Sequence, residues 1–471
     1  MKQRARIVCT LGPASDTDEV VRAMVRAGMD VARLNFSHGD HPTLAARIER
    51  VRRIAKEEKA VVAILGDLQG PKIRVGEIAG GLAQLSAGMP FTLTTRTRVG
   101  DSSAASIDFP DLPQSVKAGE RILVDDGLIE LVVLSAGGTD VVTRVVNGGA
   151  LKPHKGVNLP GVPLKISALT GKDRADLVFA AEHDLDYIAL SFVRHPEDVM
   201  ELKQLLAARG ATVPVIAKIE KLEAINAIDA ILDVSEGVMV ARGDLGVEAP
   251  PEQVPLFQKM IIQKANAIGK PVITATQMLE SMINNPRPTR AEASDVANAI
   301  LDGTDAVMLS AETATGKYPV EAVATMERIA DAVVESTQFK HRQHNIGQGG
   351  ASVTDAIGNA TCEMARQLNA RLIITATRSG FTARMISRHR PATPILAVTS
   401  SEKTQRQLAL VWGIQSALVD ETGSTDAMIA ASLAAAVEQG VADAGDLAVI
   451  TAGVPAAISG RTNMIQVRVV E

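Results

Sequence analysis

The stretch Val213-Pro214-Val215-Ile216-Ala217-Lys218-Ile219-Glu220 places a cation and an anion two positions apart in an apolar, strand-like run. Because successive side chains of a strand alternate between its faces, Lys218 and Glu220 share one face and the apolar residues share the other. Two charges on a buried strand face are costly unless they bind something. An internal ion pair is one explanation. The other is a site for chemistry that builds negative charge on a phosphorylated or enolic oxygen, which an ammonium and a metal-binding carboxylate would stabilise.

The run is one of several short apolar segments that alternate with amphipathic, helix-like stretches. Eight of them have the composition of strands: Ile7–Thr10, Val31–Ser37, Val61–Leu65, Tyr187–Phe192, Val213–Glu220, Gly237–Val240, Pro271–Thr276 and Ala306–Ser310. Eight parallel strands separated by helices close a (β/α)8 TIM-type barrel. An open, doubly wound sheet has the same alternation, and strand counting does not decide between the two.

The alternation is interrupted after the third strand. From Gly70 to Lys165 the sequence is rich in Gly, Thr and Val, with period-two runs separated by turn residues. Asp125-Asp126-Gly127, between Arg121–Val124 and Ile129–Leu134, predicts a hairpin. We therefore expect a small β-barrel domain inserted into the larger barrel. The expected limits are 70–165 for the insertion and 1–69 and 166–340 for the two parts of the barrel.

A second α/β domain is expected after the barrel. The polar, Gly-bearing stretch from His341 to Gly350 predicts a linker. Residues 351–471 then return to alternating strands and helices, which is typical of a parallel sheet. The strand-like runs lie near Leu372–Thr375, Ile395–Val398, Ser416–Val419, Leu447–Thr451 and Met464–Val469.

The composition restricts the functional class. A chain of 471 residues is too long for one ordinary core and predicts about two to four domains. A net charge of −5 and a single Trp argue against a nucleic-acid-binding protein. Two cysteines, Cys9 and Cys362, form no disulfide framework, and no run approaches membrane-spanning length. We therefore expect a cytoplasmic protein that binds neither nucleic acid nor membrane.

The second predicted strand carries polar residues on one face. In Val31-Ala32-Arg33-Leu34-Asn35-Phe36-Ser37-His38, period-two alternation puts Arg33, Asn35 and Ser37 together and turns the apolar residues toward the outer helices. A guanidinium matches a phosphate, and the amide and hydroxyl oxygens can ligate a cation. Polar layers do fill some barrel interiors, but three such residues near the carboxyl end of a strand favour a site.

Two carboxylates end neighbouring strands. Glu220 ends one strand, and Asp244 follows the next in Arg242-Gly243-Asp244-Leu245-Gly246. A glycine turn between strand and helix lets main-chain amides approach a carboxylate or phosphate. Asp244 can join Glu220 as an oxygen ligand of Mg²⁺, an ion that keeps several waters and needs few protein ligands. Taken alone, a Gly-Asp turn is more often only a turn.

Hydroxyl groups end the seventh and eighth strands, in Thr274-Ala275-Thr276-Gln277-Met278 and Leu309-Ser310-Ala311-Glu312-Thr313. Thr276 and Ser310 can each bind substrate or hold a proton-relaying water. Each can equally cap the following helix.

Together these runs resemble the signatures of the pyruvate kinase family, in family order and with family spacing, from Arg6 to the C-terminus. The motifs are Thr10-Leu11-Gly12-Pro13-Ala14, Arg33-Leu34-Asn35-Phe36-Ser37-His38, Ala217-Lys218-Ile219-Glu220, Ala241-Arg242-Gly243-Asp244-Leu245-Gly246, Thr274-Ala275-Thr276-Gln277-Met278-Leu279-Glu280-Ser281-Met282 and Leu301-Asp302-Gly303-Thr304-Asp305-Ala306-Val307-Met308-Leu309-Ser310-Ala311-Glu312-Thr313. The resemblance implies a catalytic barrel, a mobile β lid inserted after strand three and a C-terminal regulatory domain. It also implies that the phosphoryl group of phosphoenolpyruvate passes to ADP, giving pyruvate and ATP.

The resemblance further implies residue roles. Lys218 would stabilise the transferring phosphoryl group and the enolate, Arg33 would bind the phosphoryl group, and Glu220 with Asp244 would hold Mg²⁺ or Mn²⁺. The substrate carboxylate would meet the amides of Gly243 and Asp244 together with Thr276, and Thr276 and Ser310 would order the water that protonates the enolate. The nucleotide would contact Asn35, His38, Arg74 and, from the lid, Lys155.

The sequence departs from the family pattern after the third strand. It has Asp67-Leu68-Gln69-Gly70-Pro71-Lys72-Ile73-Arg74 where many members have Asp-Thr-Lys-Gly-Pro-Glu-Ile-Arg. In the potassium-dependent pattern, the ion is held by residues that match Asn35, Ser37, Asp67 and the carbonyl of Leu68. Lys72 reverses a charge beside that site, and its ammonium can replace the ion with Asp67 as its partner. We therefore expect K⁺ to be dispensable; the alternative is that Lys72 points to solvent and K⁺ still binds.

The C-terminal domain contains a strand-to-helix turn of hydroxyls and glycine, Thr377-Arg378-Ser379-Gly380-Phe381-Thr382. Such a turn suits a phosphate. In the family the matching loop receives phosphorylated effectors, so a sugar phosphate or nucleotide monophosphate is expected there. A simple capping turn is the alternative.

Two other functions are compatible with parts of this sequence. A Mg²⁺-dependent barrel lyase acting on a pyruvate enolate would share the metal and the barrel, but it explains neither Arg74 and Lys155 nor the effector-like domain. A catalytically silent regulatory homologue would have lost catalytic charges, whereas Lys218, Glu220 and Asp244 are intact. The family also implies a homotetramer.

Overall fold

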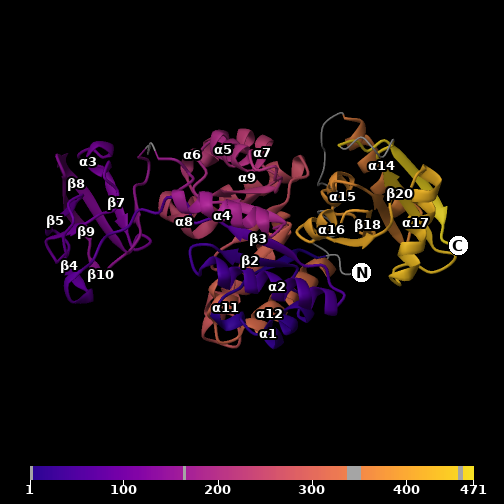
Figure 1. Ribbon diagram of the computed structural model, residues 1–471, viewed down its shortest axis with the longest axis horizontal. Helices are drawn as coiled ribbons and strands as arrows, with labels where there is room; N and C mark the ends of the chain where they lie inside the picture. Colours follow the sequence, from indigo (N-terminus) through magenta and orange to yellow (C-terminus); the bar gives the residue numbers. More distant parts are fainter. Residues whose placement is uncertain (1–3, 163–165, 337–351, 455–459) are drawn as a thin grey trace.

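The computed structural model describes residues 4–162, 166–336, 352–454 and 460–471. Three bodies follow one another along its long axis: the inserted domain, called the lid below, then a central barrel, then the C-terminal domain (Figure 1). The predicted linker from His341 to Gly350 lies outside the described residues.

The central body is a closed barrel of eight parallel strands, which confirms the predicted (β/α)8 fold over the open sheet. Each expected strand is present and ends within two residues of its predicted limits. The strands are β1 (Arg6–Thr10), β2 (Val31–Asn35), β3 (Ala63–Asp67), β12 (Tyr187–Leu190), β13 (Val215–Ile219), β14 (Gly237–Ala241), β15 (Val272–Ala275) and β16 (Ala306–Leu309). Strand β13 begins at Val215 because Pro214 has no N–H to donate to the sheet.

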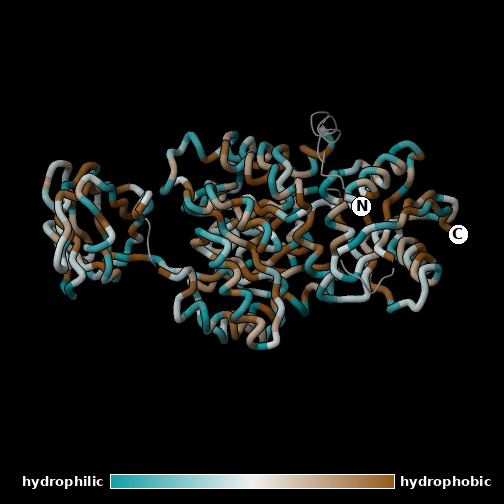
Figure 2. Tube along the Cα trace, turned by 90° about the horizontal axis from the view of Figure 1, so that it is seen from above, coloured by the Kyte–Doolittle hydropathy of each residue, from teal (hydrophilic) through white to brown (hydrophobic). Residues whose placement is uncertain are grey.

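Helices surround the barrel. They are α1 (Asp18–Arg26), α2 (His41–Glu57), α4 (Gly171–Glu182), α5 (Pro196–Ala207), α6 (Leu222–Asn226), α7 (Ile228–Val234), α8 (Arg242–Glu248), α9 (Val254–Ala267), α10 (Arg290–Asp302), α11 (Ala311–Ala314) and α12 (Pro319–Glu335). Outward-facing strand residues such as Ala32, Leu34 and Phe36 pack under these helices in the largest core of the molecule. Hydrophobic segments accordingly concentrate inside the central body, and polar segments lie at its rim (Figure 2). This alternation leaves the inward face free for the polar residues of β2 and β13.

The lid is inserted between β3 and β12, as predicted. Its elements are β4 (Ala83–Leu85), β5 (Pro90–Thr94), β6 (Ala104–Ser106), α3 (Leu112–Ser115), β7 (Arg121–Val124), β8 (Ile129–Gly137), β9 (Asp140–Asn147), β10 (Gly149–Leu151) and β11 (Val157–Asn158). The predicted hairpin is confirmed, with Val124 opposite Ile129. The strands pair as one six-stranded and one two-stranded sheet around a single core, and bulges in β8 bend the larger sheet. The expected small barrel is therefore not a closed ring of strand pairs in the described part of the chain.

The C-terminal domain is a five-stranded sheet with helices on its faces. Its elements are α14 (Val353–Gln367), β17 (Leu372–Ala376), α15 (Phe381–Ser387), β18 (Ile395–Thr399), α16 (Glu402–Leu408), β19 (Ile414–Leu418), α17 (Thr425–Glu438), β20 (Leu447–Ala452) and β21 (Met464–Val469). The expected parallel sheet is present in β17–β20, and β21 is added at one edge antiparallel to β20. The connection from Ala452 to Met464 is too short for a crossover helix.

The C-terminal domain covers the amino-terminal end of the barrel strands. Ala409 and Leu410 complete the apolar cluster inside the barrel. Arg390 is buried against Asp305, at 3.0 Å, just before β16. This end of the barrel is closed, so substrate access lies at the opposite end, where the lid is attached (Figure 1). Within the described ranges, no helix combines the length and the apolar character needed to span a membrane.

Candidate active site

A charged cluster lies where β2, β3 and β13 end, on the side of the barrel that carries the lid. The ammonium of Lys218 lies 2.9 Å from Glu220 Oε1 and 3.3 Å from Asp67 Oδ1. It also donates to Ser191 Oγ at 2.8 Å. Lys218 is 12% exposed, while both carboxylates are 1% exposed. The predicted internal ion pair therefore exists, and it opens onto a site instead of closing a dry core.

The local field keeps Lys218 positively charged. Burial alone would lower the pKa of Lys218, but the carboxylates of Asp67 and Glu220 outweigh it and hold the pKa above its ordinary value. Burial raises the pKa of Glu220 against the opposing effect of Lys218, and the nearby carboxylate of Asp244 adds to the rise. The site thus combines a fixed cation with a carboxylate whose ionisation is costly until another cation arrives.

Arg33 and Asp67 form the second half of the cluster. The guanidinium of Arg33 binds Asp67 Oδ2 at 2.7 Å and donates to Thr10 Oγ1 at 2.9 Å. Burial would raise the pKa of Asp67, but Lys218 and Arg33 more than offset it and lower the pKa. Asp67 Oδ1 makes only the ion contact with Lys218 and has no hydrogen-bond partner in the described part of the chain. Arg33 is therefore held in place at the mouth of the barrel, as its position on β2 predicts.

The loops after β14 and β15 form one wall of the same opening. The Gly243 N–H donates to Thr276 Oγ1 at 2.8 Å. Thr276 has a φ of 70°, a conformation that side chains other than glycine rarely adopt and that often marks a functional site. Gly243, Asp244, Thr276 and Ser310 line a single cleft of about 1250 Å³. The cleft thus brings together the residues predicted for the substrate carboxylate and the proton relay with Asp244, one of the two predicted metal ligands.

A divalent metal fits the two carboxylates. The described residues contain no cluster of three or more His, Cys, Asp or Glu that would hold a metal without help. Burial is the main cause of the raised pKa of Glu220, and the charge of Asp244 adds to it, as expected for two carboxylates at neighbouring strand ends. Two carboxylate ligands completed by substrate oxygens and water are the set that Mg²⁺ prefers.

The prediction that Lys72 pairs with Asp67 is wrong. The carboxylate of Asp67 is bound by Arg33 and Lys218, while Lys72 is exposed and lines the cleft that Asp244 also lines. The negative charge of Asp67 is therefore already neutralised by two cations, Arg33 of β2 and Lys218 of β13. The other predicted oxygens are also engaged: Asn35 Oδ1 accepts the Ser37 N–H at 3.0 Å, and the Leu68 carbonyl accepts the Ser191 hydroxyl at 2.7 Å.

The residues predicted for the nucleotide lie in two places. Asn35 and the exposed His38 lie at the end of β2. Arg74 and Lys155 lie on the lid, where they are neighbours: the Val75 N–H donates to the Lys155 carbonyl at 3.0 Å. The Arg74 guanidinium donates to the His154 carbonyl, and the Lys155 ammonium pairs with Asp125 at 2.8 Å. Both cations are thus bound to groups of the lid itself.

Three further residues shape the site, and the sequence analysis assigned them no role. Ser191 connects Lys218 to the Leu68 carbonyl. Thr10 supports Arg33 and donates to the Leu309 carbonyl at 2.9 Å. Buried Glu312 accepts the N–H groups of Ser310 and Leu279. Thr10 ends β1 and Ser191 directly follows β12, much as Thr276 and Ser310 directly follow their strands. A hydroxyl at the end of a barrel strand could therefore have predicted Thr10 and Ser191 as site residues.

The predicted effector loop borders a second cavity, in the C-terminal domain. This cavity of about 370 Å³ is lined by Thr377, Arg378, Ser379, Phe381 and Thr382, among others. Gly380, with a φ of 75°, makes the turn into α15. Arg378 and Glu421, which both line this cavity, lie 4.0 Å apart. The loop thus presents hydroxyls and a guanidinium to an open space.

Comparisons with known proteins agree over the whole chain. The family description "Pyruvate kinase, barrel domain" matches residues 2–323, and "Pyruvate kinase, alpha/beta domain" matches residues 355–468. The pyruvate kinase of Clostridium acetobutylicum is 48% identical over 472 residues, covering 100% of both chains. Pyruvate kinase 2 of Synechocystis sp. is 50% identical over 475 residues, covering 100% of this chain and 80% of that one. A crystal structure of a pyruvate kinase from Cryptosporidium parvum matches with a TM-score of 0.93 at 38% identity, covering 100% of this chain and 96% of the other. The chain therefore belongs to the pyruvate kinase family of phosphotransferases.

Proposed function

We propose that the chain catalyses Mg²⁺-dependent transfer of the phosphoryl group of phosphoenolpyruvate to ADP, at the carboxyl end of the barrel strands. One observation carries the proposal: the Lys218 ammonium lies between Asp67, which Arg33 also binds, and Glu220, and the nearby carboxylate of Asp244 lines the cleft at this end of the barrel. Phosphoryl transfer needs positioning and charge neutralisation more than covalent help, and this cluster offers both.

Lys218 and Arg33 act on the phosphoryl group. Both cations are oriented by Asp67 before substrate arrives, so little reorganisation is needed when charge develops. Lys218 also stabilises the enolate oxygen left after transfer. Glu220 and Asp244 would hold Mg²⁺, which supplies a further positive charge for the phosphoryl and enolate oxygens.

Thr276 and Gly243 bind the substrate carboxylate, and Thr276 with Ser310 orders the water that protonates the enolate at carbon. Two fixed contacts support this assignment. The Thr276 hydroxyl lies between the Gly243 N–H and the Ala275 carbonyl, and Glu312 fixes the Ser310 backbone. Lys218 is not the proton donor, since its raised pKa makes it a poor acid.

The lid brings the nucleotide-binding cations to the barrel. Arg74 and Lys155 would exchange their lid partners for ADP phosphates, while Asn35 and His38 meet the nucleotide from β2. Closure would also exclude water, so that the phosphoryl group passes to ADP and is not hydrolysed. A lyase acting on a pyruvate enolate would bind no nucleotide, so it would not explain Arg74 and Lys155.

One experiment tests the activity and its regulation together. Initial velocities of ATP formation are measured against phosphoenolpyruvate with ADP and Mg²⁺, with and without sugar phosphates and nucleotide monophosphates. We expect ATP to form, and a phosphorylated effector bound at Thr377–Thr382 to lower the phosphoenolpyruvate concentration needed for half-maximal rate. Absence of ATP would contradict the proposed reaction. Pyruvate or enolate chemistry without ATP would favour the lyase, and effector binding without turnover would favour the silent homologue.

Potassium is expected to be dispensable. Lys72 reverses the charge that many relatives carry beside the monovalent-cation site. It does not pair with Asp67, which Arg33 and Lys218 already balance, but its ammonium adds positive charge to the cleft that Asp244 also lines. Replacing K⁺ by a large organic cation in the assay should change kcat by less than about tenfold. As the matched variant, Lys72→Glu should gain a requirement for K⁺. A loss of several orders of magnitude in the unaltered enzyme would contradict the proposal.

The remaining proposals concern the setting of the enzyme. We propose a homotetramer in the cytoplasm, with effector and substrate sites coupled through contacts between the domains. The buried pair Arg390–Asp305 and the partly buried pair Arg406–Asp186 join the C-terminal domain to the barrel and support such coupling.

A further inference from the structure

We infer that Asp173 is the anchor on which the lid turns: its buried carboxylate binds both chain segments that connect the lid to the barrel. The inference rests on the proposed function, because it concerns how the lid is positioned over the nucleotide. It identifies Asp173 as a positioning residue, which acts through the hinge and touches no reacting atom.

The geometry is that of one carboxylate shared by two segments. Asp173 Oδ1 accepts the Gly70 N–H at 3.2 Å, where the chain leaves the barrel for the lid. Asp173 Oδ2 accepts the Thr170 N–H at 2.8 Å and the Thr170 hydroxyl at 2.6 Å, where the chain has returned. The side chain of Asp173 is fully buried. The two segments are therefore tied to each other through a single group.

Local sequence explains why Asp173 points this way. Thr170 and Asp173 form the capping box of α4, in which the Thr170 hydroxyl accepts the Asp173 N–H at 3.1 Å. A capping box uses one face of the acidic side chain and leaves its second oxygen free. Here that second oxygen reaches Gly70, so an ordinary helix cap has become a link to the lid.

The charge of Asp173 strengthens the link. None of the ion pairs among the described residues includes Asp173, and the neighbouring Lys172 turns instead to Asp176, at 2.6 Å. The carboxylate therefore depends on the Gly70 and Thr170 donors. Hydrogen bonds to an ionised acceptor are about twice as strong as neutral ones.

Gly70 is confined on its other side by the active site. It has a φ of 68°, and a Cβ there would lie 2.6 Å from the Phe192 ring and 3.0 Å from Ser191 Cβ. Ser191 in turn binds Lys218 and the Leu68 carbonyl. The first hinge segment thus lies between Asp173 and the residues that orient the catalytic lysine.

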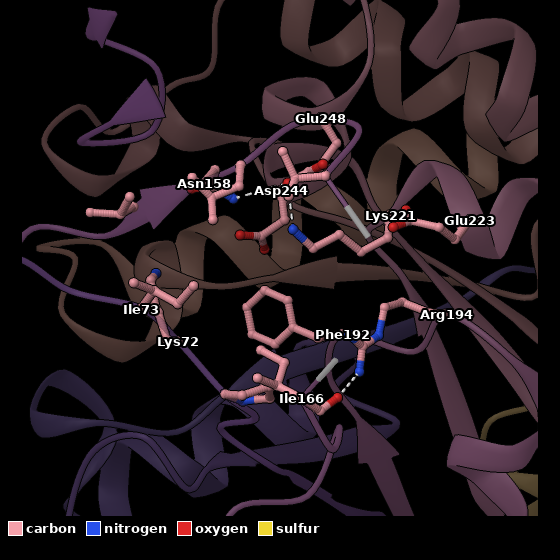
Figure 3. Close-up of a pocket in the computed structure, with 14 residues that line it drawn as sticks. Lys72, Ile73, Asn158, Ile166, Phe192, Arg194, Lys221, Glu223, Asp244 and Glu248 are labelled. Atoms are coloured by element: carbon pink, nitrogen blue, oxygen red, sulfur yellow. Dashed lines mark hydrogen bonds and ion pairs between the residues drawn. The ribbon is translucent and has the colours of Figure 1, made fainter. Parts of the chain in front are cut away.

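Figure 3 shows a pocket next to the hinge, where residues of the lid, such as Asn158, meet residues of the barrel, such as Lys221 and Glu248. The Phe192 ring lies at the centre of the pocket, between Ile166 of the returning chain and Lys221 of the barrel. Arg194 donates to the Ile166 carbonyl, and Asn158 of the lid donates to Glu248 at 3.4 Å. These two hydrogen bonds hold only the returning side of the lid, whereas Asp173 binds the outgoing chain at Gly70 as well as Thr170. Loss of the anchor should therefore leave the lid attached but less well oriented.

The test compares two buried carboxylates on the same helix. Asp173→Asn keeps the size of the side chain but replaces one acceptor by a donor that opposes Gly70 or Thr170. Asp176→Asn is the matched control: Asp176 is 1% exposed, and it binds His41 and Lys172 but not the hinge. For Asp173→Asn we expect kcat/KM for ADP to fall about tenfold, mainly through KM. For Asp176→Asn we expect no such change.

A second measurement separates the hinge from the barrel. Exchange of the methyl hydrogens of pyruvate with solvent deuterium, in the presence of Mg²⁺, uses the barrel residues alone. It should change less than about twofold in Asp173→Asn. Thr170→Val, which removes one of the donors to the carboxylate, should raise the KM for ADP by about threefold. This variant keeps the inference testable if Asp173→Asn does not fold.

Limited proteolysis reports on the lid without any activity assay. Trypsin should cut the first hinge segment, at Lys72 or Arg74, several-fold faster in Asp173→Asn than in Asp176→Asn. Equal cleavage together with equal ADP kinetics in the two variants would overturn the inference, as would loss of pyruvate exchange in step with phosphoryl transfer. If the unaltered enzyme makes no ATP, the proposed function fails, and the proteolysis comparison still decides whether Asp173 anchors the lid.

Discussion

Lys218→Met is expected to lower kcat about a thousandfold, because it removes a preoriented charge from a site where negative charge develops. Methionine fills a similar volume, Asp67 keeps its contact with Arg33 at 2.7 Å, and Glu220 still accepts the Phe192 N–H at 2.7 Å. The fold should therefore survive. Since the cation acts most strongly in the transition state, kcat should fall far more than the affinity for phosphoenolpyruvate.

The measurement is the rate of ATP formation, with binding of phosphoenolpyruvate followed separately. Lys203→Met is the control, since the Lys203 ammonium pairs with Glu236 at 2.6 Å, next to the first residue of β13 and at the other end of that strand from Lys218. That variant should lose a salt bridge and keep its activity. A Lys218→Met enzyme within about tenfold of the unaltered one would rule out the role assigned to this lysine.

The parts of the fold that were predictable are those that local patterns determine. The alternation in Val31–His38 predicted which side chains of β2 turn inward, and Arg33 and Asn35 do lie at the opening of the barrel. Eight apolar runs predicted eight strands, but closure of the barrel depends on pairing between β1 and β16, far apart in sequence. Counting could not supply that pairing.

Long-range contacts explain what the sequence could not provide. The charge reversal at Lys72 could be read from the sequence, but the predicted pairing of Lys72 with Asp67 was wrong. Arg33 and Lys218 approach Asp67 from two other strands. The contact between Gly70 and Asp173 joins residues 103 positions apart. Nothing in the local pattern around Asp173 distinguishes it from an ordinary capping residue.

The direction of β21 shows the same limit. Its composition predicted a strand at the correct residues, Met464–Val469. Its antiparallel pairing with β20 follows from the short connection between them, a property of topology that composition does not carry.

Replacing Glu220, a proposed metal ligand, is expected to have an effect as large as replacing the lysine. Glu220→Gln should raise the Mg²⁺ concentration needed for activity at least about a hundredfold, since an amide is a far weaker ligand than a carboxylate. Chelation of Mg²⁺ should abolish ATP formation by the unaltered enzyme. Binding of Mn²⁺, followed by electron paramagnetic resonance, measures the ligand set without relying on turnover. Asp186→Asn is the control: it removes a fully buried carboxylate that pairs with Arg52 and Arg406 before β12, and it should leave Mn²⁺ binding unchanged.

The pH dependence of metal binding distinguishes a ligand from a bystander. Burial raises the pKa of Glu220, Lys218 opposes this, and Asp244 adds to the rise, so protons compete with the metal at a higher pH than for an exposed glutamate. Metal binding requires the ionised form, so affinity should be highest above this raised pKa and should fall as pH falls through it, by about tenfold per unit below it. Asp67 has a lowered pKa and stays ionised through the same window, which keeps Arg33 and Lys218 in place.

Glu220→Gln should make the dependence of Mn²⁺ affinity on pH shallower, because the group that titrates has been removed. An affinity in the unaltered enzyme that stays constant from about pH 7.5 to about pH 4.5 would mean that Glu220 does not bind the metal.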